Sequence, residues 1–294
     1  MRCSHPSVIA TPGGGTMSVP CNRCMACRIN KTSEWVSRLR MEMMDFDQMS
    51  YITLTYADEF LPESGSLDPD ALRKFWMRLR KANPGVKIKY FACGEYGPKT
   101  NRPHYHAVVL GVDFAPWYIL RYQDGRPVFT SDRLRELWPF GDPTVDDVND
   151  TTIGYVTGYI QKKLFGGAAD REYKEKGLYP PFQRSSTHLG ERFALEHASQ
   201  LRGNMFTWVN GKKRPVPKYI SRKIGLNVPE APDLPSPLAQ KAFEEQQKRY
   251  QEFEKFKASR TTEHYEYYGD FNRLALAQQE LELRKKQQNY RSKL

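Results

Sequence analysis

The sequence predicts an α+β fold, with a cysteine-rich segment at the N-terminus and a charged helical tail at the C-terminus. Residues 32–46 and 69–82 repeat apolar side chains at helical spacing, whereas residues 51–58, 87–95 and 104–111 are rich in strand-forming side chains. The chain has 294 residues, which is enough for one large or two modest domains with a real core.

Clear start and stop signals mark the first half of the chain. Residues 1–30 are expected to be loop-like, because they hold three consecutive glycines and a cluster of cysteines. Thr32 or Ser33 is the candidate N-cap of the first helix, and Pro69 marks the start of the second. The segment 96–103 carries one glycine and two prolines, so we expect a loop between the last two strands.

The second half of the chain is less regular, and no element is assigned between residues 166 and 201. The predicted elements are a short helix over 131–138 capped by Ser131 or Asp132, a weak strand over 143–148, a helix over 151–165 despite two glycines, and an Asn-Gly turn at 210–211 between strand-like flanks. We expect four parts: a cysteine-rich segment (1–30), a main domain (31–226), a Pro-rich linker (227–237) and a helical charged tail (238–294).

Charge and hydropathy narrow the class of partner. Lysine and arginine number 45 against 34 aspartate and glutamate, a formal net charge of +11. This balance favours a polyanionic partner, such as nucleic acid or an acidic membrane surface. The chain has no uninterrupted apolar run of membrane length and does not open like a signal peptide, so we expect a cytoplasmic protein.

Two of the six histidines, His104 and His106, lie one residue apart on a predicted strand. They should project to the same face, with Tyr105 pointing the other way. If the neighbouring strand pairs antiparallel, Glu95 lies opposite them, and the three side chains form a divalent-metal site with open positions. The alternative is two ordinary strand residues, although the apolar run that follows makes a polar pair costly without partners.

Tyr155 and Tyr159 are four residues apart on the helix predicted over 151–165, and Lys162 follows on nearly the same face. A tyrosine oxygen can act as a covalent nucleophile. Its ordinary pKa, near ~10, means that it needs help from a metal ion or from a nearby cation such as Lys162. The alternative is a helix that packs two tyrosines against the sheet.

Cys21, Cys24 and Cys27 form a C-x-x-C-x-x-C pattern, and Cys3 is available as a fourth ligand. Four thiolates suit a structural zinc ion, and an iron–sulfur cluster also fits thiolates at this spacing. Zinc would tie down a glycine-rich segment that lacks its own core. Cys93 stands alone on a predicted strand and is most simply a small buried residue.

Three stretches, "YITLTY", "PHYHAVVLG" and "YVTGYIQKK", occur in this order. They resemble the three motifs of the HUH endonucleases that start rolling-circle replication, and the paired tyrosines point to the two-tyrosine branch. The stretches "CSHP", "VPCNRCMACR" and "ACGEYG" look like those of the replication initiation proteins of the gokushoviruses, which are single-stranded DNA bacteriophages of the Microviridae. The resemblance covers roughly residues 1–225 and makes residues 31–226 an HUH endonuclease domain.

The resemblance implies a central antiparallel sheet flanked by helices, with the histidine pair on a middle strand. It implies that His104, His106 and Glu95 hold Mg or Mn. One of the two tyrosines would nick single-stranded DNA at a phage origin through a 5′-phosphotyrosine, and the DNA would be rejoined later. No Walker-type phosphate loop is present, so a helicase and a polymerase of the bacterial host would be needed, in whose cytoplasm the protein would act.

Basic side chains complete the expected DNA contacts. Residues 211–223 contain six of them and no acid, and two more lie beside the histidines, which gives the candidate set Lys99, Arg102, Lys212, Lys213, Arg214, Lys218, Arg222 and Lys223. The alternative for 211–223 is a solvated basic loop. Two other functions stay open: a non-catalytic, zinc-containing DNA-binding regulatory protein, and another HUH enzyme such as a relaxase or transposase.

Overall fold

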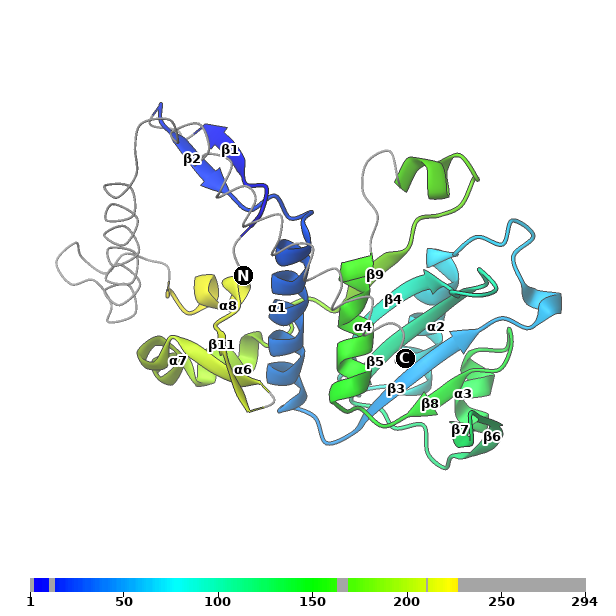
Figure 1. Cartoon of the computed structure of the whole chain (residues 1–294). Coiled ribbons are helices and arrows are strands. Elements are labelled where there is room, and N and C mark those ends of the chain that lie inside the picture. Colours follow the sequence, from blue (N-terminus) through cyan, green and yellow to red (C-terminus); the bar gives the residue numbers. More distant parts are fainter. Residues whose placement is uncertain (1–2, 11–13, 163–168, 210, 227–294) are drawn as a thin grey trace. The chain divides into compact units, whose positions relative to one another are not determined.

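The computed structural model describes residues 3–10, 14–162, 169–209 and 211–226 (Figure 1). The predicted linker and helical tail therefore lie outside the described residues. The chain divides into two compact units, one of Met1–Lys31 with Gly225–Leu294 and one of Thr32–Ile224. In the ranges that are described, no helix is both long and apolar enough to cross a membrane.

A seven-stranded sheet forms the centre of the larger unit, with the strand order β6-β7-β8-β3-β5-β4-β9. Every neighbouring pair is antiparallel, which confirms the predicted α+β class and its central antiparallel sheet. The strands are β3 (Met49–Thr55), β4 (Lys89–Tyr96), β5 (Pro103–Leu110), β6 (Tyr118–Gln123), β7 (Arg126–Thr130), β8 (Thr144–Asp146) and β9 (Phe182–Ser185).

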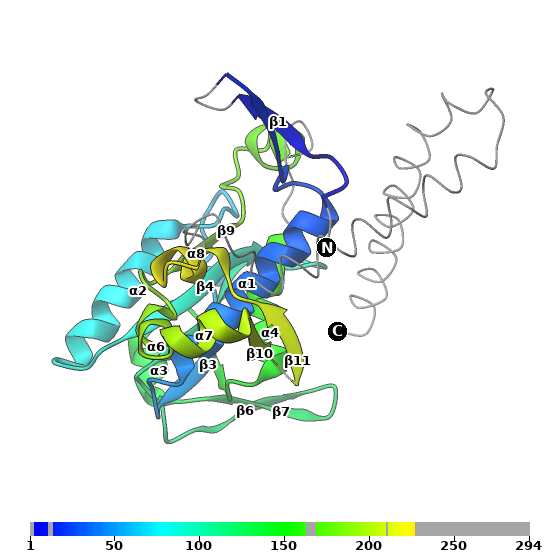
Figure 2. The ribbon, with the colours of Figure 1, turned by 90° about the vertical axis from the view of Figure 1, so that its left-hand side faces the viewer.

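Helices cover both faces of this sheet (Figure 1 and Figure 2). One face packs against α1 (Met25–Met43) and α4 (Asp150–Lys162), and the other against α2 (Pro69–Ala82) and α3 (Asp132–Leu137). Alternation along β5 sends Val108 and Leu110 to the first face and Val109 to the second. His104 and His106 continue the series of Val108 and Leu110, so the histidines face the side of α4.

The remaining elements are short. They are η1 (Asp58–Phe60), the π-helical turn η2 (Asp170–Lys174), α6 (Glu191–Glu196), α7 (Ala198–Asn204), β10 (Phe206–Val209), β11 (Lys212–Pro215) and α8 (Lys218–Lys223). The strands β10 and β11 pair as the hairpin that the Asn-Gly turn predicts. This hairpin, together with α6, α7 and α8, lies on the side of α1 away from α4 (Figure 1 and Figure 2).

The helix α2 forms where its sequence predicts. Pro69 occupies the first turn, and the Asp68 side chain accepts a hydrogen bond from the Asp70 backbone N–H at 2.8 Å. Its apolar stripe is buried and includes Phe75, which has no exposed surface. Truncating Phe75 to alanine would cost about 3–5 kcal/mol, because burial is lost and a cavity remains.

The helix α4 begins with reciprocal capping that sequence inspection missed. Asn149 Oδ1 accepts from the backbone N–H of Thr151 at 2.9 Å and of Thr152 at 3.1 Å. The Asn149 N–H donates to Thr152 Oγ1 at 2.9 Å. Gly154 and Gly158 each cost about 1 kcal/mol in a helix, and the cap together with three buried side chains offsets this cost.

Several expectations about local structure are wrong. The first helix begins at Met25, because the helical turn after Cys24 belongs to a cluster of cysteines rather than to an amphipathic stripe. The segment expected to be loop-like contains an antiparallel hairpin of β1 (Ser7–Ala10) and β2 (Thr16–Val19). The hairpin of β6 and β7 was not predicted, although Asp-Gly at 124–125, where both φ angles are positive, is typical hairpin chemistry.

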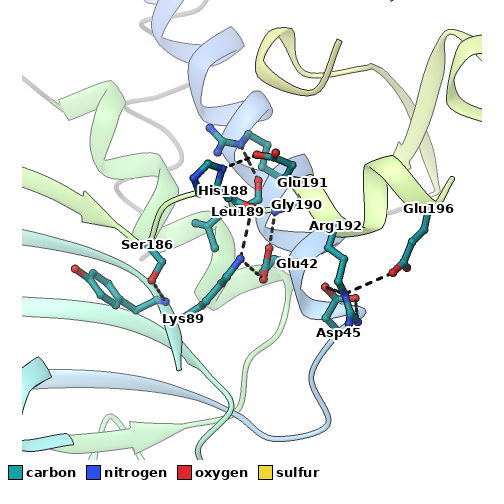
Figure 3. Close-up of polar contacts among 12 residues, drawn as sticks. Glu42, Asp45, Lys89, Ser186, His188, Leu189, Gly190, Glu191, Arg192 and Glu196 are labelled. Carbon is teal, nitrogen blue, oxygen red and sulfur yellow. Dashed lines mark hydrogen bonds and ion pairs between the residues drawn. The ribbon is translucent and has the colours of Figure 1, made fainter. Parts of the chain in front are cut away.

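A polar network ties α1 to the turn that precedes α6 (Figure 3). Glu42 has no exposed surface, pairs with Lys89 at 2.7 Å and accepts a hydrogen bond from the Gly190 N–H at 2.7 Å. Asp45 pairs with Arg192 at 2.6 Å. Because a buried carboxylate is costly without such partners, these contacts specify how the segment after β9 meets α1.

Candidate active site

The strands β4 and β5 bring Glu95, His104 and His106 together. In the β4–β5 register Glu95 is the direct partner of His104. Glu95 Oε1 lies 3.6 Å from His104 Nε2 and 3.4 Å from His106 Nε2. The structure thus has the antiparallel register on which the sequence hypothesis depends, since a shift by one residue would turn Glu95 to the opposite face.

The spacing of these three groups fits one divalent ion. Metal–ligand bonds of about 2.1 Å at angles of about 90–109° place neighbouring ligand atoms about 3.0–3.4 Å apart. All three ligand atoms lie within 4.8 Å of one another, and Glu95 and His106 are only 5% and 8% exposed. Two imidazoles with one carboxylate suit Mn or Zn, whereas Mg favours oxygen ligands. The donor set therefore fits a metal that keeps positions open for substrate.

Hydrogen bonds to the far ring nitrogens orient both imidazoles. His104 Nδ1 lies 3.1 Å from the Arg102 carbonyl oxygen, which can only accept, so Nδ1 carries the proton and the Nε2 lone pair faces the carboxylate. A cation between them, a metal ion or a second ring proton, makes this arrangement favourable. His106 Nδ1 lies 2.8 Å from Tyr51 Oη and 3.0 Å from Thr53 Oγ1.

Tyr51 and Thr53 were not singled out from the sequence, although both lie in the motif "YITLTY". The signal that could have found them is cross-strand register, because Thr53 on β3 is the direct partner of His106 on β5. Polar side chains at alternate positions of an otherwise apolar strand need partners on the same face. The first motif thus acts through the orientation of a histidine ring.

Tyr155 projects from α4 onto the carboxylate. Its hydroxyl donates to Glu95 Oε1 at 2.7 Å, and its ring meets the His106 ring edge-on with centroids 4.8 Å apart. Burial, followed by the negative charge of Glu95, raises the pKa of Tyr155 above its ordinary value. Tyr159 is 5% exposed, and burial raises its pKa as well. Both phenols are protonated at neutral pH in this environment.

The predicted basic residues near the histidines occupy different settings. Lys99 is exposed in the loop that joins β4 to β5. Arg102 pairs with Asp58 at 2.6 Å and donates to the Tyr56 carbonyl oxygen at 2.8 Å, so its guanidinium also holds this loop. Lys162 is the last residue of α4, and its side chain lies outside the described residues.

The basic stretch 211–223 forms β11 and α8 and is not brought beside the histidines. Both elements lie on the other side of α1 from α4 (Figure 1). Lys223 pairs with Glu191 at 3.1 Å, whereas Lys218 and Arg222 are exposed. The side chain of Lys212 lies outside the described residues.

The smaller unit holds a second group of metal-ligand side chains. The four sulfurs of this group lie within 4.8 Å of one another and belong to Cys3, Cys21, Cys24 and Cys27. Cys93 is separate from them, on β4, and is fully buried as expected of a small apolar residue.

Comparison with known proteins identifies the family. The family model of the replication-associated protein ORF2 matches residues 49–164, from β3 to the end of α4. Replication-associated protein VP4 of Bdellovibrio phage phiMH2K is 30% identical over 228 residues, which cover 73% of this chain and 70% of that protein. Replication-associated protein ORF2 of Spiroplasma virus 4 is 30% identical over 220 residues, 70% of this chain and 68% of that protein.

Replication-associated protein ORF4 of Chlamydia phage 1 is 30% identical over 212 residues, which cover 69% of this chain and 52% of that protein. No solved structure matches the chain. The resemblance to phage replication proteins that the motifs indicate is thereby confirmed. The chain belongs to the ORF2 family of phage replication-associated proteins.

Proposed function

We propose that the protein is a metal-dependent endonuclease that nicks single-stranded DNA at a phage replication origin through a 5′-phosphotyrosine and later rejoins it. The observation that supports this most is the Tyr155 hydroxyl, 2.7 Å from the carboxylate oxygen that also faces two histidine nitrogens. A nucleophile and three metal ligands converge from α4, β4 and β5, in a family whose members are named for replication.

The chemistry is a transesterification in which one bond replaces another. His104, His106 and Glu95 would hold Mg or Mn, and such an ion neutralises charge on a phosphate and makes phenolate less costly. Tyr155 Oη attacks phosphorus, the bond to the 3′-oxygen breaks, and the phenol proton passes to the departing 3′-oxygen. Rejoining is the reverse: the 3′-hydroxyl attacks the phosphotyrosine and releases the phenol.

The two tyrosines divide the work by position. Tyr155 makes the first cleavage, because its hydroxyl already contacts Glu95. Tyr159 lies one helical turn further on and is nearly buried. While the first tyrosine remains linked to DNA, Tyr159 would cleave the regenerated origin at the end of a round. Lys162 remains a predicted helper of this step.

The β10–β11 hairpin is the best candidate for holding single-stranded DNA. Trp208 is 60% exposed, and Lys213 Nζ lies 5.5 Å from the centre of its ring and 4.5 Å from that of Phe206. Exposed aromatic rings stack bases, and basic side chains hold the phosphates. The wider predicted set of Lys99, Arg102, Lys212, Arg214, Lys218, Arg222 and Lys223 would extend this path, and a helicase and polymerase of the host would supply unwinding and synthesis.

Trapping the covalent adduct tests the proposal. The full chain is incubated with Mn and labelled single-stranded oligonucleotides that tile a phage origin, and the products are denatured. A labelled protein band is expected for the wild type and for Tyr159→Phe, and not for Tyr155→Phe. An adduct that survives in the double variant would refute the assignment, and DNA binding without any adduct would favour the regulatory-protein alternative.

A further inference from the structure

We propose that Cys3, Cys21, Cys24 and Cys27 form a closed site for one structural zinc ion. Its chemistry is independent of the proposed nicking reaction, since no substrate position is left when four thiolates surround the ion. All four cysteines are free thiols, and their sulfurs lie within 4.8 Å of one another. The ion would tie the strand β1 and the turn after β2 to the first turn of α1.

The sulfur spacing matches a single tetrahedral ion. Cys3 Sγ and Cys24 Sγ are 3.8 Å apart. Zinc–sulfur bonds of about 2.3 Å at tetrahedral angles place neighbouring sulfurs about 3.8 Å apart, whereas a disulfide is about 2.05 Å long. In a cluster of several irons each thiolate binds a different iron and lies further from the others, so the compact set favours one ion.

The backbone around the cysteines is arranged for negative sulfur. Cys21 Sγ accepts from the backbone N–H of Cys24 at 3.3 Å and of Arg23 at 3.4 Å. Cys3 Sγ accepts from the Cys21 N–H at 3.3 Å. Asn22 makes this turn possible with a φ of 57°. Sulfur is a weak acceptor as a thiol, so several N–H groups aimed at it indicate thiolates.

The start of α1 supplies further compensation for charge. Cys24 directly precedes the helix and Cys27 lies in its first turn, which contains no acidic residue. A zinc ion with four thiolates carries two net negative charges, and the positive end of a helix dipole stabilises anions there. Arg28, which donates to the Arg23 carbonyl oxygen at 2.7 Å, adds a cation to the same turn.

Packing of ordinary apolar cysteines does not account for this cluster. Cys24 and Cys27 are each 6% exposed, and among the described residues their buried cluster is completed by Ala26. All four side chains of β1 are exposed. In the part of this segment that the structure describes, the hairpin thus has no aliphatic core of its own, and small units of this kind usually depend on a metal or on disulfides for stability.

Metal analysis of the purified full chain tests the site. After dialysis against a weak chelator, we expect about one zinc per chain, released together with thiol protons when a thiol reagent is added. Exchange for Co²⁺ should produce a thiolate-to-cobalt charge-transfer band. Cys27→Ser should lose the zinc and the band, whereas Cys93→Ala, a change at the buried cysteine of β4, should keep both.

The outcomes separate this site from the nuclease site. His104→Ala should retain the band, because the imidazoles contribute no thiolate. A wild-type protein without the band, iron with acid-labile sulfide, or zinc retained in Cys27→Ser at the level of Cys93→Ala would each overturn the zinc site. If Cys27→Ser fails to fold, the cobalt spectrum of the wild type and of His104→Ala still decides.

Discussion

The two groups of metal-ligand side chains differ in number and in what surrounds them. The cysteine set offers four sulfurs, three of them within seven residues of sequence, and would close the coordination of an ion. The histidine set offers three atoms on two strands, with a tyrosine hydroxyl 2.7 Å from one of the ligand groups. A closed set is typical of structure and an open one of catalysis.

The support behind each set also differs. Glu95 and the histidines lie in a sheet whose two faces are each packed by helices. The cysteines lie beside an exposed hairpin, with a buried cluster made almost entirely of themselves. Loss of metal should therefore inactivate the histidine set without unfolding the sheet, and should release the N-terminal hairpin of the cysteine set.

Chelation should separate the two sets most strongly. Brief EDTA treatment is expected to abolish adduct formation, because an open three-ligand site exchanges its ion readily, and added Mn should restore it. Zinc measured on the same sample should stay bound to the closed thiolate set. Simultaneous loss of both, with a protease-sensitive N-terminus after Mn is restored, would remove the distinction.

His106→Ala is expected to reduce Mn-dependent adduct formation more than about 100-fold, since it removes a ligand and the contact with Tyr155. Circular dichroism should show a melting temperature within a few degrees of wild type. The matched change on the other side, Cys27→Ser, should lower protease resistance of the N-terminal segment while adduct formation per folded molecule stays within about threefold.

The orientation of His106 gives a smaller effect on the same side. Combining Tyr51→Phe with Thr53→Val removes both partners of His106 Nδ1 and should raise the Mn concentration for half-maximal cleavage about 10- to 100-fold. Thr55→Val is the control, because the Thr55 hydroxyl donates to the Asp142 carbonyl oxygen at 2.8 Å and not to a histidine. Equal effects of the two changes would contradict a positioning role.

A carboxylate that belongs to neither set provides a baseline for acid sensitivity. A hydrogen bond from Tyr219, assisted by His188 and Lys223, lowers the pKa of Glu191 from 4.5 to about 2. A depressed pKa stabilises the fold above pH about 4.5, and this contribution is lost as pH falls towards about 2.

Urea unfolding of Glu191→Gln should therefore show a loss of about 1 kcal/mol at neutral pH, and the difference from wild type should shrink progressively below pH ~4.5. Glu196→Gln is the control, because Glu196 is exposed and only 3.7 Å from Arg192. A difference that grows in acid would have the wrong sign.

The accuracy of the sequence predictions followed how local each interaction is. The cap and stripe of α2 were predicted, because each lies within one or two helical turns. The position of Glu95 opposite His104 was predicted only under the condition of antiparallel pairing, which the β4–β5 register meets. The early start of α1 was not predicted, since it depends on four sulfurs gathered from residues 3–27.

By itself the sequence determined the ligand types, their spacing and the faces they share, because the periods of strand and helix are local properties of the chain. Only the tertiary structure decided which groups meet. Tyr155 reaches Glu95 across 60 residues of sequence, because α4 packs on β4 and β5. Tyr51 reaches His106 across 55 residues through the β3–β5 register. Such contacts depend on packing between elements, which no local pattern encodes.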